Sequence, residues 1–383
     1  MFAWTSVVPL LSIALVGIGA AMPVGALLAS IAGLALIGSV LASVHHAEVV
    51  AHRVGEPFGT LILAIAVTVI EVALIVSMML AGGPDKSALP RDTIFSAIMI
   101  ICNGAVGLCV VVGGVRHREQ SFRLEGANAA LAALIALATL SLVLPTFTIS
   151  SPGASYTAKQ LAFAAVASLV LWGVFVFVQT IRHRDYFLPP QGAGDETAHA
   201  PPPSAKAAWA SFALLFVSLI GVIGLAKLLS PTLERTVDAA GAPPTVIGIV
   251  IALLVLSPET WAAVRAARAD RLQTSMNLAL GSALASIGLT IPTVAVLSLS
   301  SGWTLALGLD AKATVLLLLS LFLATISFST GRTTILQGVV HLVLLLLTFA
   351  VGTITLGTGR TNVMQGAVHL VIFAAFVFLA FVP

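Results

Sequence analysis

The sequence predicts an all-α polytopic membrane protein with two membrane halves. The first observation is composition, because 59% of the 383 residues are hydrophobic and only 9% are charged. Soluble domains carry about 25% charged residues. A chain this poor in charge cannot cover a water-facing surface, so its main partner must be the lipid bilayer. The second observation is a series of long apolar stretches, and the third is a pair of acids within them.

The apolar stretches predict about 11–12 transmembrane helices, because a helix needs roughly 20 apolar residues to cross a bilayer. The predicted spans are 4–22, 24–44, 58–81, 93–115, 127–145, 158–180, 208–229, 244–266, 275–300, 313–329, 337–356 and 365–382.

A polar segment divides the spans into two groups of six. It contains PPQGAGDETAHAPPPS, and proline and glycine at this density neither hold a helix nor build a core. We therefore predict an N-terminal membrane half, 1–181, a cytoplasmic linker, 182–206, and a C-terminal membrane half, 207–383. The linker is interpreted as a passive connector, with a regulatory role for its two acids as the alternative.

Arginine clusters predict the orientation. They lie in three loops that are separated by two spans each, which puts all three on one side. The positive-inside rule makes that side the cytoplasm. Both termini are then cytoplasmic, and the predicted location is a bacterial inner membrane. The clusters are Arg116, Arg118 and Arg123, then Arg182, Arg184 and Lys206, then Arg265, Arg268 and Arg271.

Glu71 and Glu259 lie deep inside predicted spans, in AVTVIEVALIVS and LLVLSPETWAAV. An acid at this depth is costly and indicates a functional site. The two spans run in opposite directions across the membrane. Inverted repeats place a binding site at the midplane between two such helices. A structural role for each glutamate, as a hydrogen-bonding group between helices, is the simpler interpretation.

Polar and helix-perturbing residues accompany both acids. Thr68 lies one turn before Glu71 and so on the same helix face. Pro258 directly precedes Glu259, and a mid-span proline leaves a carbonyl one turn back without its donor. We expect a break there, as at Pro292. Other candidates in neighbouring spans are Asn103, with its carboxamide, and GSALASIG, whose small residues Gly281, Ser282, Ala285 and Gly288 allow close helix approach.

Carboxylates, hydroxyls and a carboxamide form an all-oxygen site. Such a site suits calcium, magnesium, manganese or an alkali cation better than zinc or copper. The same carboxylates can take up protons when the cation leaves. The metal-binding residues predicted on this basis are Glu71, Glu259, Thr68 and Asn103, with cation and proton as cargo and no cofactor.

Histidines suggest further possibilities. The segment HHAEVVAHRVGE, 45–56, is interpreted as a polar helix end, with a metal site or a pH sensor as alternatives. TGRTTILQGVVHLV, 330–343, is repeated after 28 residues as TGRTNVMQGAVHLV, 358–371, which indicates duplication of a terminal helix. A haem role for His341 and His369 is the alternative.

Cys102 and Cys109 are about 10 Å apart on one helix, too far for a disulfide.

Four segments resemble the ChaA-type calcium/proton antiporters of the cation/calcium exchanger superfamily. They are GEPFGTLILAIAVTVIEVALI, VVVGGVRHREQSF, SPETWAAVRAARADRLQTSMNLALGSALASIGLTIP and TGRTNVMQGAVHLVIFAAF. The resemblance implies a ten-helix core of two inverted five-helix repeats, preceded by one extra terminal helix. It puts Glu71 and Glu259 at the family's cation-binding acids, Asn103 at its asparagine, and Gly281 and Ser282 at its Gly-Ser, which adds Ser282 to the predicted metal-binding residues.

The chain departs from the family in two respects. Vacuolar exchangers carry Gly-Asn-x-x-Glu, whereas Val67 and Thr68 precede Glu71 here, and Val255 and Leu256 precede Glu259. A cation range that includes sodium or potassium follows from this difference. The family count is eleven spans, and the tandem repeat accounts for a twelfth.

The resemblance implies a secondary transporter, not an enzyme. It would exchange cytoplasmic Ca²⁺, with Na⁺ or K⁺ as further cargo, for external H⁺ by alternating access. Alternatives are a monovalent Na⁺/K⁺:H⁺ antiporter of the same fold, a passive cation channel, and an intramembrane enzyme or haem protein. Nucleic acid is not an expected partner, because arginines in membrane proteins mostly set topology.

Overall fold

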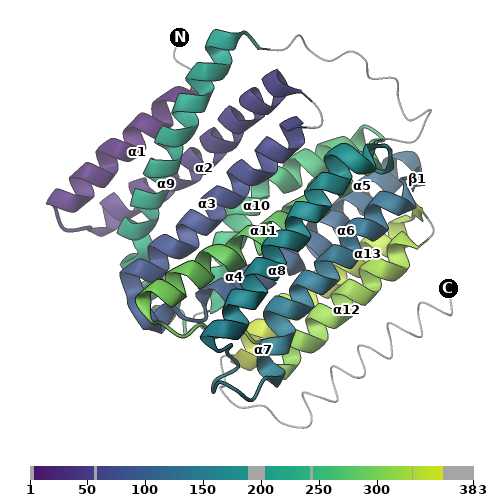
Figure 1. Ribbon diagram of the computed structural model, residues 1–383. Helices are drawn as coiled ribbons and strands as arrows, with labels where there is room; N and C mark the ends of the chain where they lie inside the picture. The colour runs from purple at the N-terminus through teal and green to yellow at the C-terminus, as the bar shows by residue number, and fades with distance from the viewer. Residues whose placement is uncertain (1–3, 56–57, 189–202, 242–244, 330, 357–383) are drawn as a thin grey trace.

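A computed structural model describes residues 4–55, 58–188, 203–241, 245–329 and 331–356 (Figure 1). Almost all of them are helical, and ten helices in these ranges are long and apolar enough to cross a membrane. The membrane fold predicted from composition is therefore confirmed. The first half contains α1 (Trp4–Ala21), α2 (Ala26–Val54), α3 (Phe58–Gly82), η1 (Gly83–Lys86), α4 (Leu89–Met99), η2 (Ile100–Ala105), α5 (Val106–His117), β1 (Gln120–Ser121), α6 (Leu124–Ala138), η3 (Thr139–Val143), α7 (Leu144–Phe147), α8 (Ala158–Phe177), η4 (Val178–Arg182) and η5 (Arg184–Phe187). The second contains α9 (Ala205–Ala239), α10 (Thr245–Arg268), α11 (Leu272–Ser301), α12 (Ala311–Phe328), β2 (Arg332–Thr333) and α13 (Ile335–Leu356).

The two halves interlock. Helices α2 and α9 pack along each other, α1 covers both, and the three form one side of the bundle in Figure 1. Helix α3 packs on α11, and α10 packs on α4, η2 and α5. The acid-bearing helix of each half thus lies against the helix that follows the acid-bearing helix of the other half. This arrangement brings the two acid-bearing helices to the middle of the molecule.

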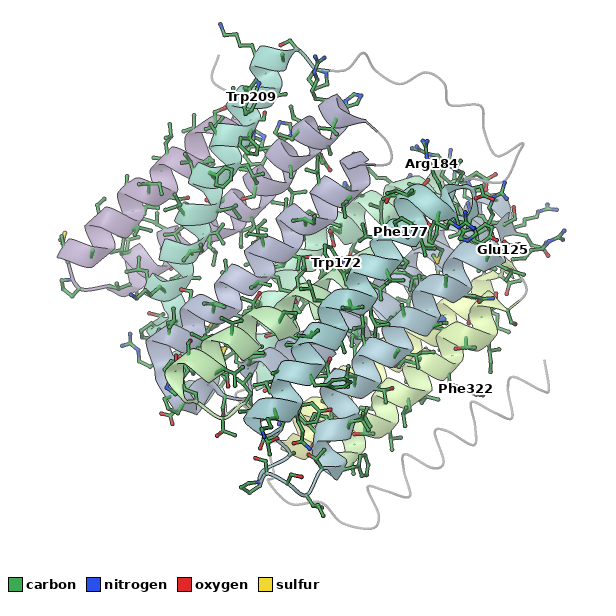
Figure 2. All side chains as sticks on the ribbon, viewed as in Figure 1. Glu125, Trp172, Phe177, Arg184, Trp209 and Phe322 are labelled. Carbon is green, nitrogen blue, oxygen red and sulfur yellow. The ribbon has the colours of Figure 1, made fainter. Side chains whose placement is uncertain are left out.

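Burial separates the central helices from those that face lipid. Most residues of α4, η2 and α11 are buried, whereas α1 and α8 are largely exposed. Figure 2 labels Phe177, Trp209 and Phe322 on the outside of the bundle, and each is about half exposed or more. Large apolar side chains on the outer surface are expected where the solvent is hydrocarbon. The polar residues of the predicted site lie on the inner helices.

Small residues allow α11 to approach its neighbours. A Cβ atom at Gly288 would lie 2.5 Å from the Cβ of Trp172 on α8, so only glycine fits there. This confirms the close approach predicted for the GSALASIG segment at Gly288. Gly281, in contrast, faces open space.

The helices are irregular at a different place from the one predicted. Helices α10 and α11 stay helical through Pro258 and Pro292, so the expected breaks are wrong. Each proline removes one hydrogen-bond donor, but the packed neighbours hold the helix together. The described residues contain three π-helical turns, η2, η3 and η4, and η2, between α4 and α5, contains Asn103. Such turns are frequent at functional sites.

The arginine-rich loops meet at one end of the bundle. The ring of His117 lies 3.0 Å from the Arg268 carbonyl, and Arg123 donates to the Leu188 carbonyl at 3.1 Å. Strands β1 and β2 pair antiparallel there, with Gln120 opposite Thr333. Figure 2 places Arg184 and Glu125 at this end as well. The common side that charge predicted for these loops is therefore confirmed, while its assignment to the cytoplasm stays a prediction.

The remaining sequence predictions are resolved in part. Cys102 and Cys109 are buried free thiols, as predicted. Among the described residues no three His, Cys, Asp or Glu side chains form a metal cluster. In the histidine segment, His46 Nε2 lies 2.9 Å from the carbonyl of Thr5, which Pro9 deprives of its helical donor. This contact gives His46 a structural role.

The tandem repeat and the linker are described only partly. The first copy of the repeat forms β2 and the start of α13. The second copy and the predicted twelfth span, 365–382, lie outside the described residues, as does linker segment 189–202. The eleventh span corresponds to α13, which is apolar over Ile335–Thr348.

Candidate cation site

Glu71 lies midway along α3, in a run of apolar residues that supports a helix through the bilayer core. Its side chain is buried, with 1% exposed. One carboxylate oxygen, Oε2, accepts a hydrogen bond from the hydroxyl of Ser286 on α11. The other, Oε1, has no hydrogen-bond partner among the described residues. A buried carboxylate oxygen without a partner is costly unless a proton or a cation satisfies it.

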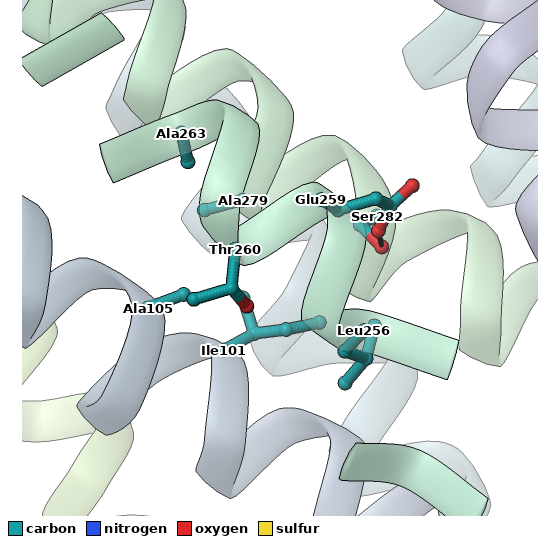
Figure 3. Close-up of a pocket in the computed structure, with 8 residues that line it drawn as sticks. All are labelled: Ile101, Ala105, Leu256, Glu259, Thr260, Ala263, Ala279 and Ser282. Carbon is teal, nitrogen blue, oxygen red and sulfur yellow. Dashed lines mark hydrogen bonds between the residues drawn. The ribbon is translucent and has the colours of Figure 1, made fainter. Parts of the chain in front are cut away.

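Glu259 holds the corresponding place on α10, directly after Pro258. Its Oε2 accepts a hydrogen bond from the hydroxyl of Ser282 on α11. The side chain is 8% exposed and borders a small pocket. Figure 3 shows Glu259 and Ser282 together at this pocket. The other lining residues are Ile101, Ala105, Leu256, Thr260, Ala263 and Ala279.

Helix α11 brings the two acids together. Ser282 and Ser286 are one helical turn apart, which is about 6 Å of rise and places both on one face. Helices α3 and α10 lie against this face from the two halves of the molecule. Each carboxylate accepts a hydrogen bond from one of the two serines on this face. Two acids separated by 188 residues thus share one serine-bearing face.

Ser286 is a member of the site that was not predicted from the sequence. The signal that could have found it is the spacing Ser282-x-x-x-Ser286 in an otherwise apolar helix, which repeats a hydroxyl on one face. The segment GSALAS was interpreted mainly through its small residues, and of its two serines only Ser282 was predicted to bind the cation. The serine pair serves both purposes, because a small side chain lets the helices approach and its hydroxyl reaches a carboxylate.

The other predicted residues lie at different distances from the acids. Thr68 is buried one turn before Glu71, and its hydroxyl donates to its own helix at the Ala64 carbonyl, at 2.8 Å. Asn103 faces α12 and α13, where its amide donates to Ser320 at 2.8 Å. It is not among the residues that line the pocket. The structure therefore brings Glu71, Glu259 and Ser282 together and directs Asn103 elsewhere.

The donor set at the centre consists entirely of oxygen. It comprises two carboxylates and the hydroxyls of Ser282 and Ser286, with Thr260 at the pocket wall. Oxygen donors of this kind suit hard cations. They can also be satisfied by protons, since a protonated carboxyl group is neutral and donates a hydrogen bond. The arrangement can therefore hold a cation or protons in turn.

Comparison with known proteins relates this site to transporters. The sequence matches the family described as "Sodium/calcium exchanger protein" over residues 22–181 and 210–382. It is 53% identical to a "Putative ionic transporter y4hA" of Sinorhizobium fredii over 80% of this chain and 83% of the relative. It is 39% identical to the "Sodium-potassium/proton antiporter ChaA" of Escherichia coli over 81% of this chain and 85% of the relative.

A more distant relative and the solved structures extend the comparison. A "Ca(2+)/H(+) antiporter" of Synechocystis is 24% identical over 67% of this chain and 71% of the relative. The structure of native YfkE superimposes with a TM-score of 0.67 at 18% identity, covering 93% of this chain and 98% of that one. The H⁺/Ca²⁺ exchanger CAX gives 0.66 at 14% identity, covering 92% and 88%. At these identities the structures show a common fold.

The family match extends over both interlocked halves of the chain, and each half carries one of the paired glutamates. The protein belongs to the sodium/calcium exchanger protein family.

Proposed function

We propose that the protein is a proton-coupled antiporter that exchanges cytoplasmic Ca²⁺, and also Na⁺ or K⁺, for external H⁺. The observation that carries the proposal is the convergence of Glu71 and Glu259 on two serines one turn apart on α11. A transporter whose site alternates between cation and protons needs acidic groups at the midplane, between two repeats that can rock against each other. It needs no cofactor, because the proton gradient drives the exchange.

Competition between the cation and protons couples the two fluxes. Glu71 and Glu259 bind the cation as carboxylates, and each takes up a proton when the cation has left. Ser282 and Ser286 donate hydrogen bonds to the free carboxylates and offer their oxygen lone pairs to a cation. Thr68 keeps the face of α3 beside Glu71 polar. Asn103 contributes indirectly, because its side chain faces α12 and α13. The site always holds either a cation or protons, because a buried carboxylate without a compensating charge or proton is unfavourable. Cations therefore do not leak through an empty site.

The position of the pocket supports an orientation. Ala263 and Ala279 line it between Glu259 and the end of the bundle that carries Arg268 and Arg271. The positive-inside rule assigns that end to the cytoplasm. On this assignment both termini are cytoplasmic. The two membrane halves, 1–181 and 207–383, act as the repeats that move, and 182–206 links them in the cytoplasm of a bacterial inner membrane.

The range of cations is supported by two observations. The relative at 39% identity is named for sodium, potassium and protons, whereas the Synechocystis relative is named for calcium. The carboxamide of Asn103 is also turned away from the acids, which leaves few neutral oxygens for the six or more ligands that Ca²⁺ takes. A purely monovalent antiporter is thus the second candidate, and cation-dependent proton release in everted vesicles separates the two.

The test of the function is Glu71→Gln and Glu259→Gln, made separately. Glutamine keeps the size of the side chain and removes its charge and its titration. We expect each variant to lose cation-dependent proton release in everted membrane vesicles, measured with a fluorescent pH indicator. Glu125→Gln is the matched control, because Glu125 is exposed at the start of α6. Normal exchange by either site variant would contradict the proposal, and cation flux without proton movement would indicate a channel.

A further inference from the structure

A chain of four buried polar side chains connects α12, α13 and η2. The ring of His341 on α13 lies between Ser327 and Asn103. Its Nε2 is 3.1 Å from the Ser327 hydroxyl, and its Nδ1 is 3.3 Å from the Asn103 carboxamide oxygen. The amide nitrogen of Asn103 donates to Ser320 at 2.8 Å. His341, Asn103 and Ser320 are fully buried, and Ser327 is 2% exposed.

One assignment of hydrogens satisfies the whole chain. The Ser327 hydroxyl donates to Nε2, and Nδ1–H donates to the Asn103 oxygen. The Asn103 amide then donates to Ser320, whose own hydroxyl donates to the Leu316 carbonyl at 2.8 Å. In this assignment all donors point in one direction, and His341 is neutral with its proton on Nδ1. Groups on α12 and α13 then hold the Asn103 carboxamide at both ends.

This chain lies on the back of the wall that faces Glu259. Asn103 belongs to the π-helical turn η2, and two other residues of that turn, Ile101 and Ala105, line the Glu259 pocket. Glycine lets α13 come close enough, since a Cβ at Gly107 would lie 3.1 Å from the Cβ of His341. A π-helical turn lacks the regular i→i−4 ladder and relies more on external contacts for its shape. The contact from α13 is therefore placed where it can set the geometry of the pocket wall.

We infer that His341 is a positioning residue for cation binding, which acts through Asn103 on the pocket wall formed by η2. The inference rests on the proposed function, since the pocket is taken to be part of the cation path. His341 belongs to the first copy of the tandem repeat, so this copy gains a role in cation binding beyond packing. A histidine that only fills space and satisfies its neighbours would tolerate any substitution that preserves packing and keeps one hydrogen bond.

Two substitutions separate the hydrogen bonds of His341. In His341→Asn the amide nitrogen occupies the place of Nδ1, so the bond to Asn103 can be kept and that to Ser327 is lost. In His341→Gln the amide reaches the place of Nε2, so the bond to Ser327 can be kept and that to Asn103 is lost. Both variants remain polar and lose the ring. Only a role through Asn103 predicts that they differ in cation binding.

The measurement is the cation dependence of proton release in everted vesicles, with thermal unfolding of each purified full-length variant. We expect His341→Gln to raise KM about fivefold, the effect of losing one buried hydrogen bond, with turnover nearly unchanged. His341→Asn should stay within about twofold of the wild type. Ser327→Ala should behave like His341→Asn. Ser320→Ala should raise KM like His341→Gln, and it tests the inference independently if His341→Gln does not fold.

His369→Gln is the matched control, because it makes the same change in the second copy of the repeat and should leave KM unaltered. Equal KM values for the two His341 variants would overturn the inference, as would an increase in KM confined to His369→Gln. Failure of the proposed function is a separate outcome, since the wild-type protein itself would then show no cation-dependent proton release.

Discussion

Glu71 and Glu259 occupy matching places on α3 and α10, yet their surroundings differ. Glu71 is enclosed, with one oxygen bonded to Ser286 and the other without a partner among the described residues. Glu259 follows a proline, is bonded to Ser282 and borders a pocket. Two equivalent acids in inverted repeats therefore have different access in one conformation. Alternating access requires that the shared site open to one side of the membrane at a time, because a site open to both sides would leak.

A second comparison, between α11 and its counterpart formed by α4, η2 and α5, shows where the asymmetry originates. Helix α11 is continuous and supplies the hydroxyls that bond both acids. The counterpart is interrupted by the π-helical turn η2, and its polar residue Asn103 bonds to Ser320 and His341. The second half thus supplies the hydroxyl partners of both acids through α11. The first half supplies η2, a pocket wall whose shape depends on contacts with α12 and α13.

The largest effect that would sharpen this comparison is expected from the two serines. Ser286→Ala removes the bond to Glu71 that the structure shows, in a place where the other oxygen already lacks a partner. Ser282→Ala leaves Glu259 beside a pocket in which water can replace the hydroxyl. Because a hydrogen bond to a charged group contributes about 1.5–3 kcal/mol, we expect Ser286→Ala to raise KM about tenfold or more. The expected increase for Ser282→Ala is about threefold.

Initial rates of proton release at graded cation concentrations give these KM values. Ser141→Ala is the control, because this serine is buried in η3 and its hydroxyl bonds to no described residue. A larger increase in KM for Ser282→Ala than for Ser286→Ala would contradict the assignment of Glu71 as the enclosed acid.

Access to the pocket can be tested by labelling. Thr260→Cys places a thiol in the pocket wall, whereas Thr68→Cys places one beside Glu71, where the side chain is 2% exposed. We expect a charged thiol reagent to label the first variant from the face that carries the arginine clusters, and to leave the second unlabelled. Cys102 and Cys109 are buried and give a low background. Mass spectrometry of the labelled protein gives the extent of reaction.

Protection by the cation sharpens the labelling result, because a bound cation should slow the reaction at Thr260→Cys. Equal labelling of the two cysteines would mean that the acids do not differ in access. Labelling from the opposite face only would reverse the proposed orientation.

The smallest effect is expected at Pro258. Proline in a helix interior is about 3 kcal/mol less favourable than alanine, so Pro258→Ala should raise the midpoint of thermal unfolding. The variant restores a donor one turn after Leu254 and stiffens α10 beside Glu259. We expect turnover to fall by about twofold to fivefold, because rocking of the repeats becomes harder.

Pro231→Ala is the matched control, because Pro231 lies inside α9 with an exposed side chain. It should raise the unfolding midpoint without slowing exchange. If Pro258→Ala exchanged at the wild-type rate, the proline would have no part in distinguishing the two acids.

The sequence by itself determined the membrane class, the common side of the arginine loops and the two acids, because each depends on local composition. Lipid selects long apolar helices, and a glutamate among them is conspicuous. Ser282 was predicted from its place in the resemblance. The continuity of α10 and α11 through their prolines was not predicted, because neighbouring helices compensate for a missing donor.

Only the tertiary structure decided which polar groups meet. Ser286 reaches Glu71 across 215 residues, and Asn103 reaches Ser320 and His341 across 217 and 238. Hydropathy cannot report these contacts, because they depend on how the two halves interlock and which face each helix turns inward. Composition determined the solvent in which the protein lies and the charges that it must bury, whereas packing between the halves decided where those charges are satisfied.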